Sequence, residues 1–475
     1  MRRNLTLWGA LGLSLAITAP TLAMGLNGAL PAKLAGSAVP LVFLIGFVGV
    51  AAVMYGFVRL TRYFNHAGSV YALAGVTMGP RAGFFGGFAL LGVYTALAIS
   101  TLGSTAQFTK VFLADAGVHL DIPWPVIALA TLAFATYLAT MDTRNATRVL
   151  LTIESIGIVL MLVIVVVVFA KLAGGDAPRG QTFSSDVLVP SGVSFGAIMA
   201  ATVYAFLSFA GIEGAAALGE ETRDPRRNIP RSIIGAVLLT GVLYFVVMLA
   251  QTLGFGTDAA GVKAFGESGA PLADVAKSYA GSTVATAFSG AATVSSFAAA
   301  LGCVTAASRI LFALGRDGFG FAAWGREPRR GGTPIPALLT VAAVSVVATL
   351  AHAIAGTSPF DMYFYWATLG VIGLLVVYAV TSLGALRYLF TRGLAPRWEA
   401  VIPVVAVAYL AYVFYKQVWP VPDPPYNLFP YIVAAWLLAG VAMIVFRPEL
   451  TRRIGEGFER AEGLLDDEPK APSNT

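Results

Sequence analysis

The segment from Ser208 to Arg231 reads SFAGIEGAAALGEETRDPRRNIPR, and it decides how the rest of the chain is interpreted. An apolar helix runs into the small residues Ala210 and Gly211, meets an acid at Glu213, and continues to a charged exit. An ionisable residue inside a hydrophobic span costs about 2.5–3.5 kcal/mol on insertion scales and is by default a functional candidate. Small residues beside it allow the helix to break and expose backbone carbonyls to a cavity. This pattern is typical of a transporter binding site.

The composition of the chain excludes a soluble fold. Of 475 residues, 57% are hydrophobic and only 12% are charged, whereas a soluble domain has roughly 25% charged residues. The single cysteine, Cys303, provides no disulfide framework, and His66, His119 and His352 are too scattered for a metal site. The sequence also lacks a G-x-x-x-x-G-K-S/T phosphate-binding loop. We therefore predict an all-α membrane protein that needs no cofactor or metal.

The apolar runs give the number of membrane crossings. A helix needs about 20 apolar residues to cross the hydrocarbon core. Twelve runs meet or approach this length: 8–30, 38–62, 80–113, 124–141, 147–172, 192–218, 232–256, 282–315, 334–353, 360–388, 399–418 and 428–446. The third and eighth are long, which indicates a tilted helix or one that extends past the bilayer.

The N-terminal run has two interpretations. Arg2 and Arg3, an apolar stretch and small residues near Ala23 resemble a secretory signal peptide. However, Pro20 lies inside the run and many further spans follow it. We therefore favour a first membrane helix that is retained.

The positions of the basic residues predict the topology. If the N-terminus lies inside, 24 of the 31 Lys and Arg residues fall on the cytoplasmic side and 7 on the opposite side. Such a bias is the signature of the positive-inside rule. We therefore expect a multi-pass protein of the bacterial cell membrane with both termini in the cytoplasm. The positive net charge then reflects orientation in the lipid bilayer and does not indicate a nucleic-acid partner.

The regions between and after the spans are short. The segment 257–280 between the seventh and eighth spans is long enough for a short helix. The end of the chain, 454–475, is polar and contains Pro and Ser, so we expect a disordered cytoplasmic tail. No loop is long enough for a second folded domain.

The first span is interrupted in a way that matches the sixth. Residues 14–32 read SLAITAPTLAMGLNGALPA, where Pro20 removes a backbone donor and Gly25, Asn27 and Gly28 follow within two turns. The two spans are five apart, so they cross in opposite directions. Paired broken helices at matching positions of inverted halves point to a transporter site at mid-membrane. A half-helix N-terminus offers N–H groups to an anion and a C-terminus offers carbonyls to a cation, which together suit an amino acid. Ordinary Pro and Gly of membrane helices are the alternative interpretation.

Two acids lie well within a span, Glu154 in the fifth and Glu213 in the sixth, and both are candidates for coupling. Glu213 follows the break, where it can bind a substrate ammonium or carry a proton; alternatively, it is a structural acid bonded to a neighbouring helix. Glu154 lies two turns beyond the basic end of its helix. For Glu154 the competing interpretation is an ion pair with Arg144 or Arg148.

Aromatic and hydroxyl side chains near the breaks complete the set of candidates. Phe206 and Phe209 are candidates for a gate over the substrate, and Tyr204 is a third aromatic near the break that can pack over it. Phe209 is favoured because it lies within the break, although each of the three can also simply fill the core. Further groups that can face the cavity, or instead make helix–helix contacts, are Tyr94, Gln107, Ser295 and Ser296.

Several motifs occur together in order over residues 10–390: Phe209, Gly211, Glu213, Glu220, Glu221, Asp224-Pro225-Arg226-Arg227, Ile229-Pro230, Asn65-His66-Ala67-Gly68, Tyr71, Ser308-Arg309 and Arg316-Asp317-Gly318. In these motifs the sequence resembles bacterial permeases of the amino acid–polyamine–organocation superfamily. The resemblance implies a LeuT-like five-plus-five inverted repeat in residues 1–390, with a first repeat at about 8–172 and a second at about 192–388. Two peripheral transmembrane helices at 399–446 would follow.

The resemblance also implies how a substrate is held. The backbone of Ala23, Met24, Gly25 and Leu26 would meet a carboxylate, and that of Ser208, Phe209, Ala210 and Gly211 the amino group. Glu213 matches an acid that relatives use in substrate or proton coupling. The chain departs from many relatives where they carry a Gly-Ser-Gly-like triplet, here Ala23 to Leu26. It also departs in the fifth span, where some carry a lysine and this chain reads Glu154-Ser155-Ile156-Gly157.

We therefore predict a secondary active transporter of an amino acid or related small amine, coupled to protons and not an enzyme. A sodium-coupled symporter, with Ser295 and Ser296 as hydroxyl ligands, and an exchanger are alternatives within the same fold. A membrane-embedded enzyme would need a metal cluster or an activated nucleophile, for which the sequence offers no candidate. A non-transporting membrane sensor is the alternative from a different class.

Overall fold

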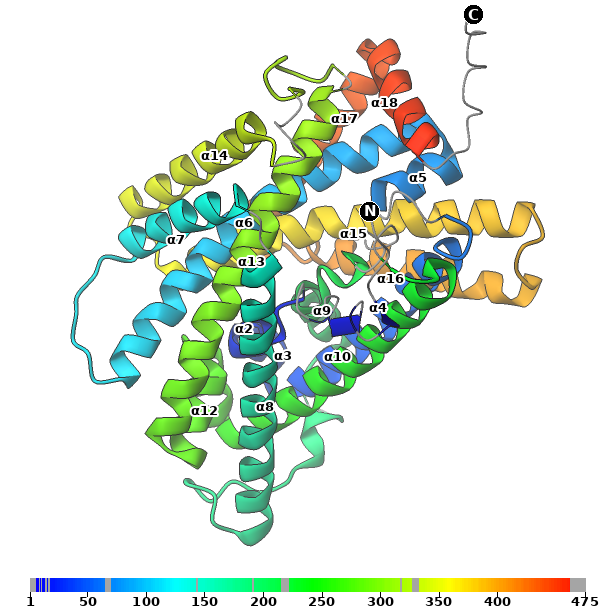
Figure 1. Ribbon diagram of the computed structural model, residues 1–475. Helices are drawn as coiled ribbons and strands as arrows, with labels where there is room; N and C mark the ends of the chain where they lie inside the picture. Colours follow the sequence, from blue (N-terminus) through cyan, green and yellow to red (C-terminus); the bar gives the residue numbers. More distant parts are fainter. Residues whose placement is uncertain are drawn as a thin grey trace, which may run out of the picture.

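The computed structural model of the protein describes residues 18–64, 70–141, 144–189, 192–214, 222–316, 318–326 and 333–461, with single residues between 6 and 15. In these ranges the architecture is helical (Figure 1). The helices of the first half are α2 (Pro20–Leu26), α3 (Ala29–Ala35), α4 (Val39–Leu60), α5 (Val70–Met78), α6 (Pro80–Asp115), α7 (Trp124–Ala139), α8 (Arg144–Gly174) and α9 (Phe195–Phe209). Those of the second half are α10 (Pro225–Phe255), α11 (Ala259–Glu267), α12 (Pro271–Ala280), α13 (Ser282–Arg316), α14 (Ile335–Ile354), α15 (Pro359–Thr391), α16 (Val401–Lys416), α17 (Phe429–Phe446) and α18 (Pro448–Ala461).

Among the described residues, ten helical segments are long and apolar enough to cross a membrane. Each corresponds to a span predicted from the sequence. The predicted span at 124–141 forms α7, which has 16 residues and is shorter than the others. The predicted first span at 8–30 lies partly outside the described residues and includes α2. The protein is therefore an all-helical, multi-pass membrane protein, while the count of twelve remains a prediction.

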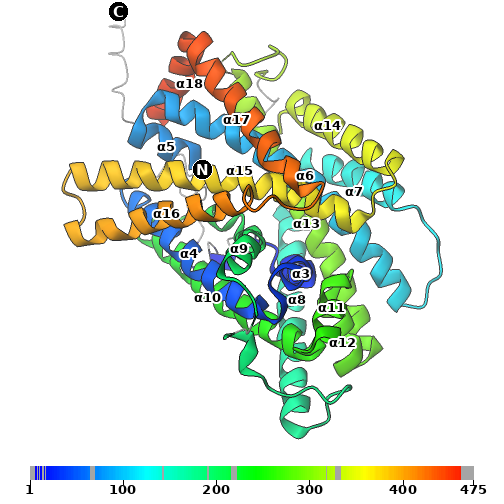
Figure 2. The same ribbon diagram turned by 180° about the vertical axis from the view of Figure 1, so that it is seen from behind.

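The most extensive packing joins α6 to α13 and to α15. The short helix α3 and the helix α9 lie in the middle of the bundle in both views, with α4 and α10 beside them (Figures 1 and 2). The helix α2 contacts α8, α13 and α10. The short central helices are therefore enclosed by long spans that come from both halves of the chain.

Two central helices are interrupted, and the local sequence explains both interruptions. Ala19 has φ 44° and ψ 61°, a left-handed conformation, and directly precedes Pro20, the first residue of α2. A residue before proline is pushed out of the right-handed helical region, which ends the preceding helix there. The helix α9 ends at Phe209, and Gly211 has φ +97°, a value that only glycine adopts without strain.

The ends of the chain and the loop before α13 complete the fold. The segment 257–280 contains α11 and α12, which confirms the helical content expected there. The helix α18 packs against α6 and α5 with Thr451 and Ile454 fully buried. The disordered tail was expected to start at residue 454, but α18 continues to Ala461, so the predicted start is wrong. Residues 462–475 lie outside the described part.

Candidate functional site

The sixth-span acid lies directly behind the break in α9. Glu213 is 3% exposed. Its Oε2 accepts a hydrogen bond of 2.6 Å from the Tyr378 hydroxyl of α15 and one of 3.1 Å from the Gly211 N–H. Its Oε1 lies 3.4 Å from the Tyr94 hydroxyl of α6. A buried carboxyl is therefore held by its own broken helix and by tyrosines from two long spans.

Tyr94 was predicted from the sequence to face the cavity, and the structure brings it to Glu213. Tyr378 was not identified, because it is one of 17 tyrosines and lies 165 residues away in the sequence. The only sequence feature that points to Tyr378 is a hydroxyl group near the middle of an apolar span. Such a group must find a partner in the bundle, because lipid offers none.

The fifth-span acid, Glu154, accepts a hydrogen bond from the backbone at the break in the first span. The Thr21 N–H donates a hydrogen bond of 2.8 Å to Glu154 Oε1, and the Leu22 N–H donates one of 3.2 Å to the Ser295 hydroxyl of α13. These N–H groups lie in the first turn of α2, where the helix itself provides no acceptor. Glu154 therefore caps a half-helix. The side chains of Arg144 and Arg148, its predicted partners, lie outside the described part.

The predicted substrate segment of the first span lies in a short helix between two interruptions. Residues 23–26 belong to α2, and the Ala23 N–H donates to the Ala19 carbonyl at 3.0 Å. The span is interrupted before α2, at Thr18 and Ala19, and again between α2 and α3, at Asn27 and Gly28. One carbonyl of this segment is engaged from outside, because Gln251 Nε2 of α10 donates to the Met24 oxygen at 3.0 Å. Gln251 was not identified from the sequence.

The predicted segment of the sixth span is joined to the first span directly. Asn27 Nδ2 donates a hydrogen bond of 2.8 Å to the Ser208 hydroxyl, and Asn27 Oδ1 accepts one of 2.7 Å from the Tyr363 hydroxyl of α15. Asn27 and Ser208 are 1% and 0% exposed. The two broken spans are thus connected by a buried polar contact.

The two gate candidates have different surroundings. The Phe209 ring lies 5.0 Å from the Tyr244 ring of α10, centroid to centroid, and 6.5 Å from that of Phe47. Phe206 instead packs against Tyr409 of α16 at 5.6 Å. Tyr204 likewise packs against a ring, that of Phe364. Phe209 therefore packs against α10 and α4 at the end of α9, whereas Phe206 packs against α16 and Tyr204 against α15.

The remaining polar candidates divide between two places. Ser296, next to Ser295 in α13, is fully buried, and its hydroxyl has no hydrogen-bond partner within the described ranges. Gln107 Nε2 donates to the Gly269 carbonyl at 3.0 Å, in the segment between α11 and α12. Gln107 therefore anchors a loop at the end of α6 rather than lining the centre.

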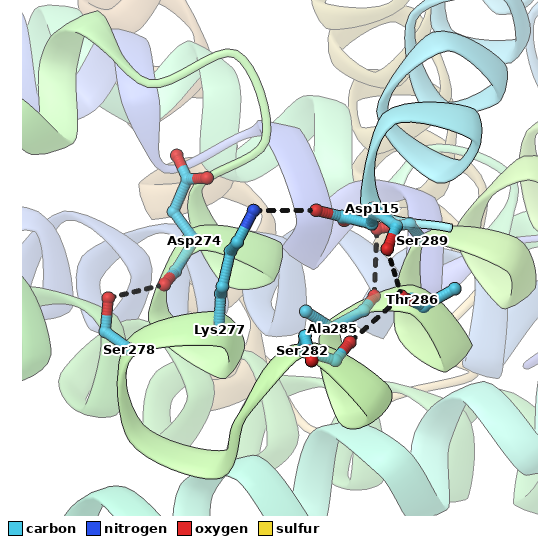
Figure 3. A network of polar contacts seen from close by, with 8 residues as sticks. All are labelled: Asp115, Asp274, Lys277, Ser278, Ser282, Ala285, Thr286 and Ser289. Atoms are coloured by element: carbon cyan, nitrogen blue, oxygen red, sulfur yellow. Dashed lines mark hydrogen bonds and ion pairs between the residues drawn. The ribbon is translucent and has the colours of Figure 1, made fainter. Parts of the chain in front are cut away.

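A second polar network lies where α6, α12 and α13 meet (Figure 3). Asp115 forms an ion pair of 3.3 Å with Lys277, and its carboxylate accepts a hydrogen bond of 2.9 Å from the Ser289 hydroxyl. Partial desolvation raises the pKa of the nearby Asp274 carboxyl, while the Ser268 hydroxyl, at 2.5 Å, partly offsets this shift. A groove of about 510 Å³ beside the network is lined by Phe112, Asp115, Ser282, Thr283, Thr286, Ala287, Gly290 and Ala291.

The opposite end of the bundle has its own ion pair. Arg59, in the last turn of α4, pairs with Glu399, which lies in the 3₁₀ helix Arg397–Ala400 directly before α16. The Tyr55 hydroxyl donates a hydrogen bond of 2.5 Å to the same carboxylate. Each of these two ion pairs therefore joins the end of a long helix to a neighbouring segment.

A bundle of apolar helices with two interrupted central spans and buried acids at both breaks defines a membrane transporter. The family model for amino acid permeases matches residues 11–455. The chain therefore belongs to the amino acid permease family, whose relatives are transporters and not enzymes.

The relatives and the fold agree with this assignment. The chain is 27% identical over 380 residues to the branched-chain amino acid permease BcaP of Lactococcus lactis, with 76% of each chain covered. It is 24% identical over 400 residues to the low-affinity putrescine importer PlaP of Escherichia coli, with 82% of each covered. The crystal structure of a manganese transporter from Eremococcus coleocola shares the fold, with a TM-score of 0.57, 12% identity, and coverage of 94% of this chain and 96% of that one.

Proposed function

We propose that the protein is a proton-coupled secondary transporter that moves an amino acid or a related small amine across the cytoplasmic membrane by alternating access. The observation that carries the proposal is the buried Glu213, held by Tyr378 and Gly211 immediately after the sixth-span break. An acid at that position is removed from water yet remains beside the segment proposed to bind substrate.

The proposed substrate site lies between the broken spans. Its sixth-span side is the backbone of Ser208 to Gly211, and its first-span side is the segment from Ala23 to Leu26, which Asn27 connects to Ser208. Phe209 is the proposed gate. The two named relatives act on branched-chain amino acids and on putrescine, and both kinds of molecule carry an amino group. This shared group is the part that a common binding site would recognise.

The proposed proton carrier is Glu213. In its neutral form this carboxyl can donate a hydrogen bond, and in its charged form it accepts from the tyrosines. Loss of the proton therefore changes the contacts between the break, α6 and α15. Glu154 has a supporting role in the proposal, because its carboxylate holds the Thr21 N–H and thereby fixes the start of α2.

The proposed architecture is the five-plus-five inverted repeat in residues 1–390, with α16 and α17 as the peripheral helices and both termini in the cytoplasm. The ion pairs Arg59–Glu399 and Lys277–Asp115 then lie at the inner and outer ends.

The test is counterflow in proteoliposomes that are preloaded with a mixed pool of amino acids and amines. Labelled candidates are offered outside, with and without a pH gradient and with and without sodium. Accumulation driven by the pH gradient supports the proposal. Accumulation that requires sodium would instead indicate a sodium symporter, and substrate binding without counterflow would indicate a sensor.

A further inference from the structure

One face of α10 follows the broken first span. Tyr244, Met248 and Gln251 are spaced by four and three residues, so they share one side of the helix. The Tyr244 hydroxyl lies beside Thr18, and Gln251 contacts the Met24 carbonyl two helical turns further along. This face therefore follows the first span from Thr18, before the break, to Met24 in the segment proposed to bind substrate.

The orientation of the Gln251 amide is set by its neighbour. A carbonyl only accepts hydrogen bonds, so the Gln251 group that points at the Met24 oxygen, 3.0 Å away, is the NH₂. The other amide atom, Oε1, is fully buried and has no hydrogen-bond partner within the described part of the chain. Buried polar atoms in folded proteins are nearly always paired, so an acceptor without a partner at a binding segment indicates a ligand donor.

We propose that Gln251 is a specificity-determining residue that selects substrates with a second hydrogen-bond donor remote from the primary amino group. Aliphatic diamines and amino acids with an amide side chain have such a donor, and branched aliphatic amino acids do not. Hydrogen-bonding sites reject analogues that lack the matching group much more strongly than apolar pockets reject an altered shape. The inference rests on the proposed function and narrows it to one class of substrate.

The test uses pairs of similar shape in proteoliposome counterflow at symmetric pH: asparagine with leucine, and putrescine with pentylamine. The wild type is expected to favour the donor-bearing member of at least one pair by about tenfold or more. In Gln251→Leu this ratio should fall close to one, with transport of the aliphatic member retained. Gln251→Glu, which keeps an acceptor oxygen, should preserve the preference for the donor-bearing member.

The control is Gln181→Leu. Gln181 Nε2 also donates to a carbonyl of α10, that of Gly254 at 2.9 Å, but at the end of the helix near α12. The ratio of donor-bearing to aliphatic substrate transported by Gln181→Leu should equal that of the wild type.

Two results would overturn the inference. The first is a wild type that transports substrates without favouring the donor-bearing member of either pair. The second is a Gln251→Leu variant with an unchanged ratio, whether its transport of both members is retained or falls in equal proportion. A wild type that exchanges none of the four compounds, nor any amine of the mixed pool, would overturn the proposed function itself.

Discussion

The breaks in the first and sixth spans are both closed by a buried acid that accepts a backbone N–H, but the acids are held differently. Glu154 reaches across from α8 to cap Thr21, and the Ser295 hydroxyl caps the next N–H. Glu213 belongs to the broken span itself and accepts from Gly211 and from Tyr378. The first acid therefore acts as a cap supplied by a neighbouring helix, whereas the second connects its own break to two long spans.

Under the proposed function, this difference gives Glu154 a positioning role and Glu213 a role in proton coupling. A cap needs only an acceptor oxygen, which a neutral amide also provides. A proton carrier needs a group that gains and loses a proton, which an amide cannot do. Substitution of glutamate by glutamine at the two positions should therefore have very different effects.

The largest effect is expected from Glu213→Gln. This change should lower pH-driven uptake by about 100-fold, or ~2.7 kcal/mol, because the proton carrier is lost. Glu154→Gln should stay within about threefold of the wild type, because Gln Oε1 still accepts from Thr21. Initial rates in proteoliposomes with an imposed pH gradient measure both variants, and equal protein content in the membrane is the control. Similar losses of uptake in the two variants would contradict the proposal that Glu213 carries the proton while Glu154 only positions α2.

A steric change should damage the first break without touching either acid. A Cβ at Gly157 of α8 would lie 2.2 Å from the Thr21 Oγ1, which leaves no room for a side chain. Gly157→Val should therefore displace α2 and reduce counterflow by about tenfold, since overpacking typically costs 1–3 kcal/mol. Gly302→Ala in α13 is the matched control, because a Cβ there meets no atom within 4 Å. Normal counterflow in Gly157→Val would show that α2 tolerates displacement.

The tyrosines at Glu213 should differ in importance because their distances differ. Tyr378 lies at 2.6 Å and Tyr94 at 3.4 Å from the carboxylate. Tyr378→Phe should lower pH-driven uptake by about fivefold, and Tyr94→Phe by less than about twofold, in line with the modest net energy of one hydrogen bond. The same uptake assay tests both variants. The reverse order would mean that Tyr94 is the main partner during transport.

The smallest effect concerns stability at the end of the bundle near α12. Asp274 is exposed at the surface, but partial desolvation raises the pKa of its carboxyl above the 3.8 of a free carboxyl, with Asp115 adding to the rise and the Ser268 hydrogen bond and Lys277 opposing it. The charged form is therefore disfavoured in the folded protein, and stability should fall as the pH rises from about 4 through the raised pKa. Asp274→Asn should flatten this dependence of Tm on pH in detergent. An unchanged slope of Tm against pH in Asp274→Asn would mean that other groups cause this pH dependence.

Much of this organisation follows from local sequence. Apolar length predicts the spans, and Pro20 and Gly211 predict where two of them break, because each acts on its own backbone. The break before α2 lies at Ala19, because a residue that precedes proline leaves the right-handed helical region. Gly25 is instead a packing residue, because a Cβ there would meet Phe108 Cζ at 2.5 Å.

The partners across the bundle could not be predicted in the same way. Gln251 lies 227 residues from Met24, and Tyr363 lies 336 residues from Asn27. Helical periodicity gives the buried face of a span but not the residue that faces it on another span. Glu154 illustrates this limit: the sequence offered Arg144 and Arg148 as partners, whose side chains lie outside the described part, but it gave no sign of the Thr21 N–H of the first span that the structure places on Glu154.

The central claim is that the acid of the sixth-span break carries the proton, and substrate-induced proton movement tests it most directly. Substrate is added to proteoliposomes that contain a pH-sensitive dye, and proton uptake is measured beside substrate uptake. The wild type and Glu154→Gln should move protons with substrate, and Glu213→Gln should exchange substrate without proton movement. Proton movement that persists in Glu213→Gln at the wild-type ratio to substrate would contradict the account.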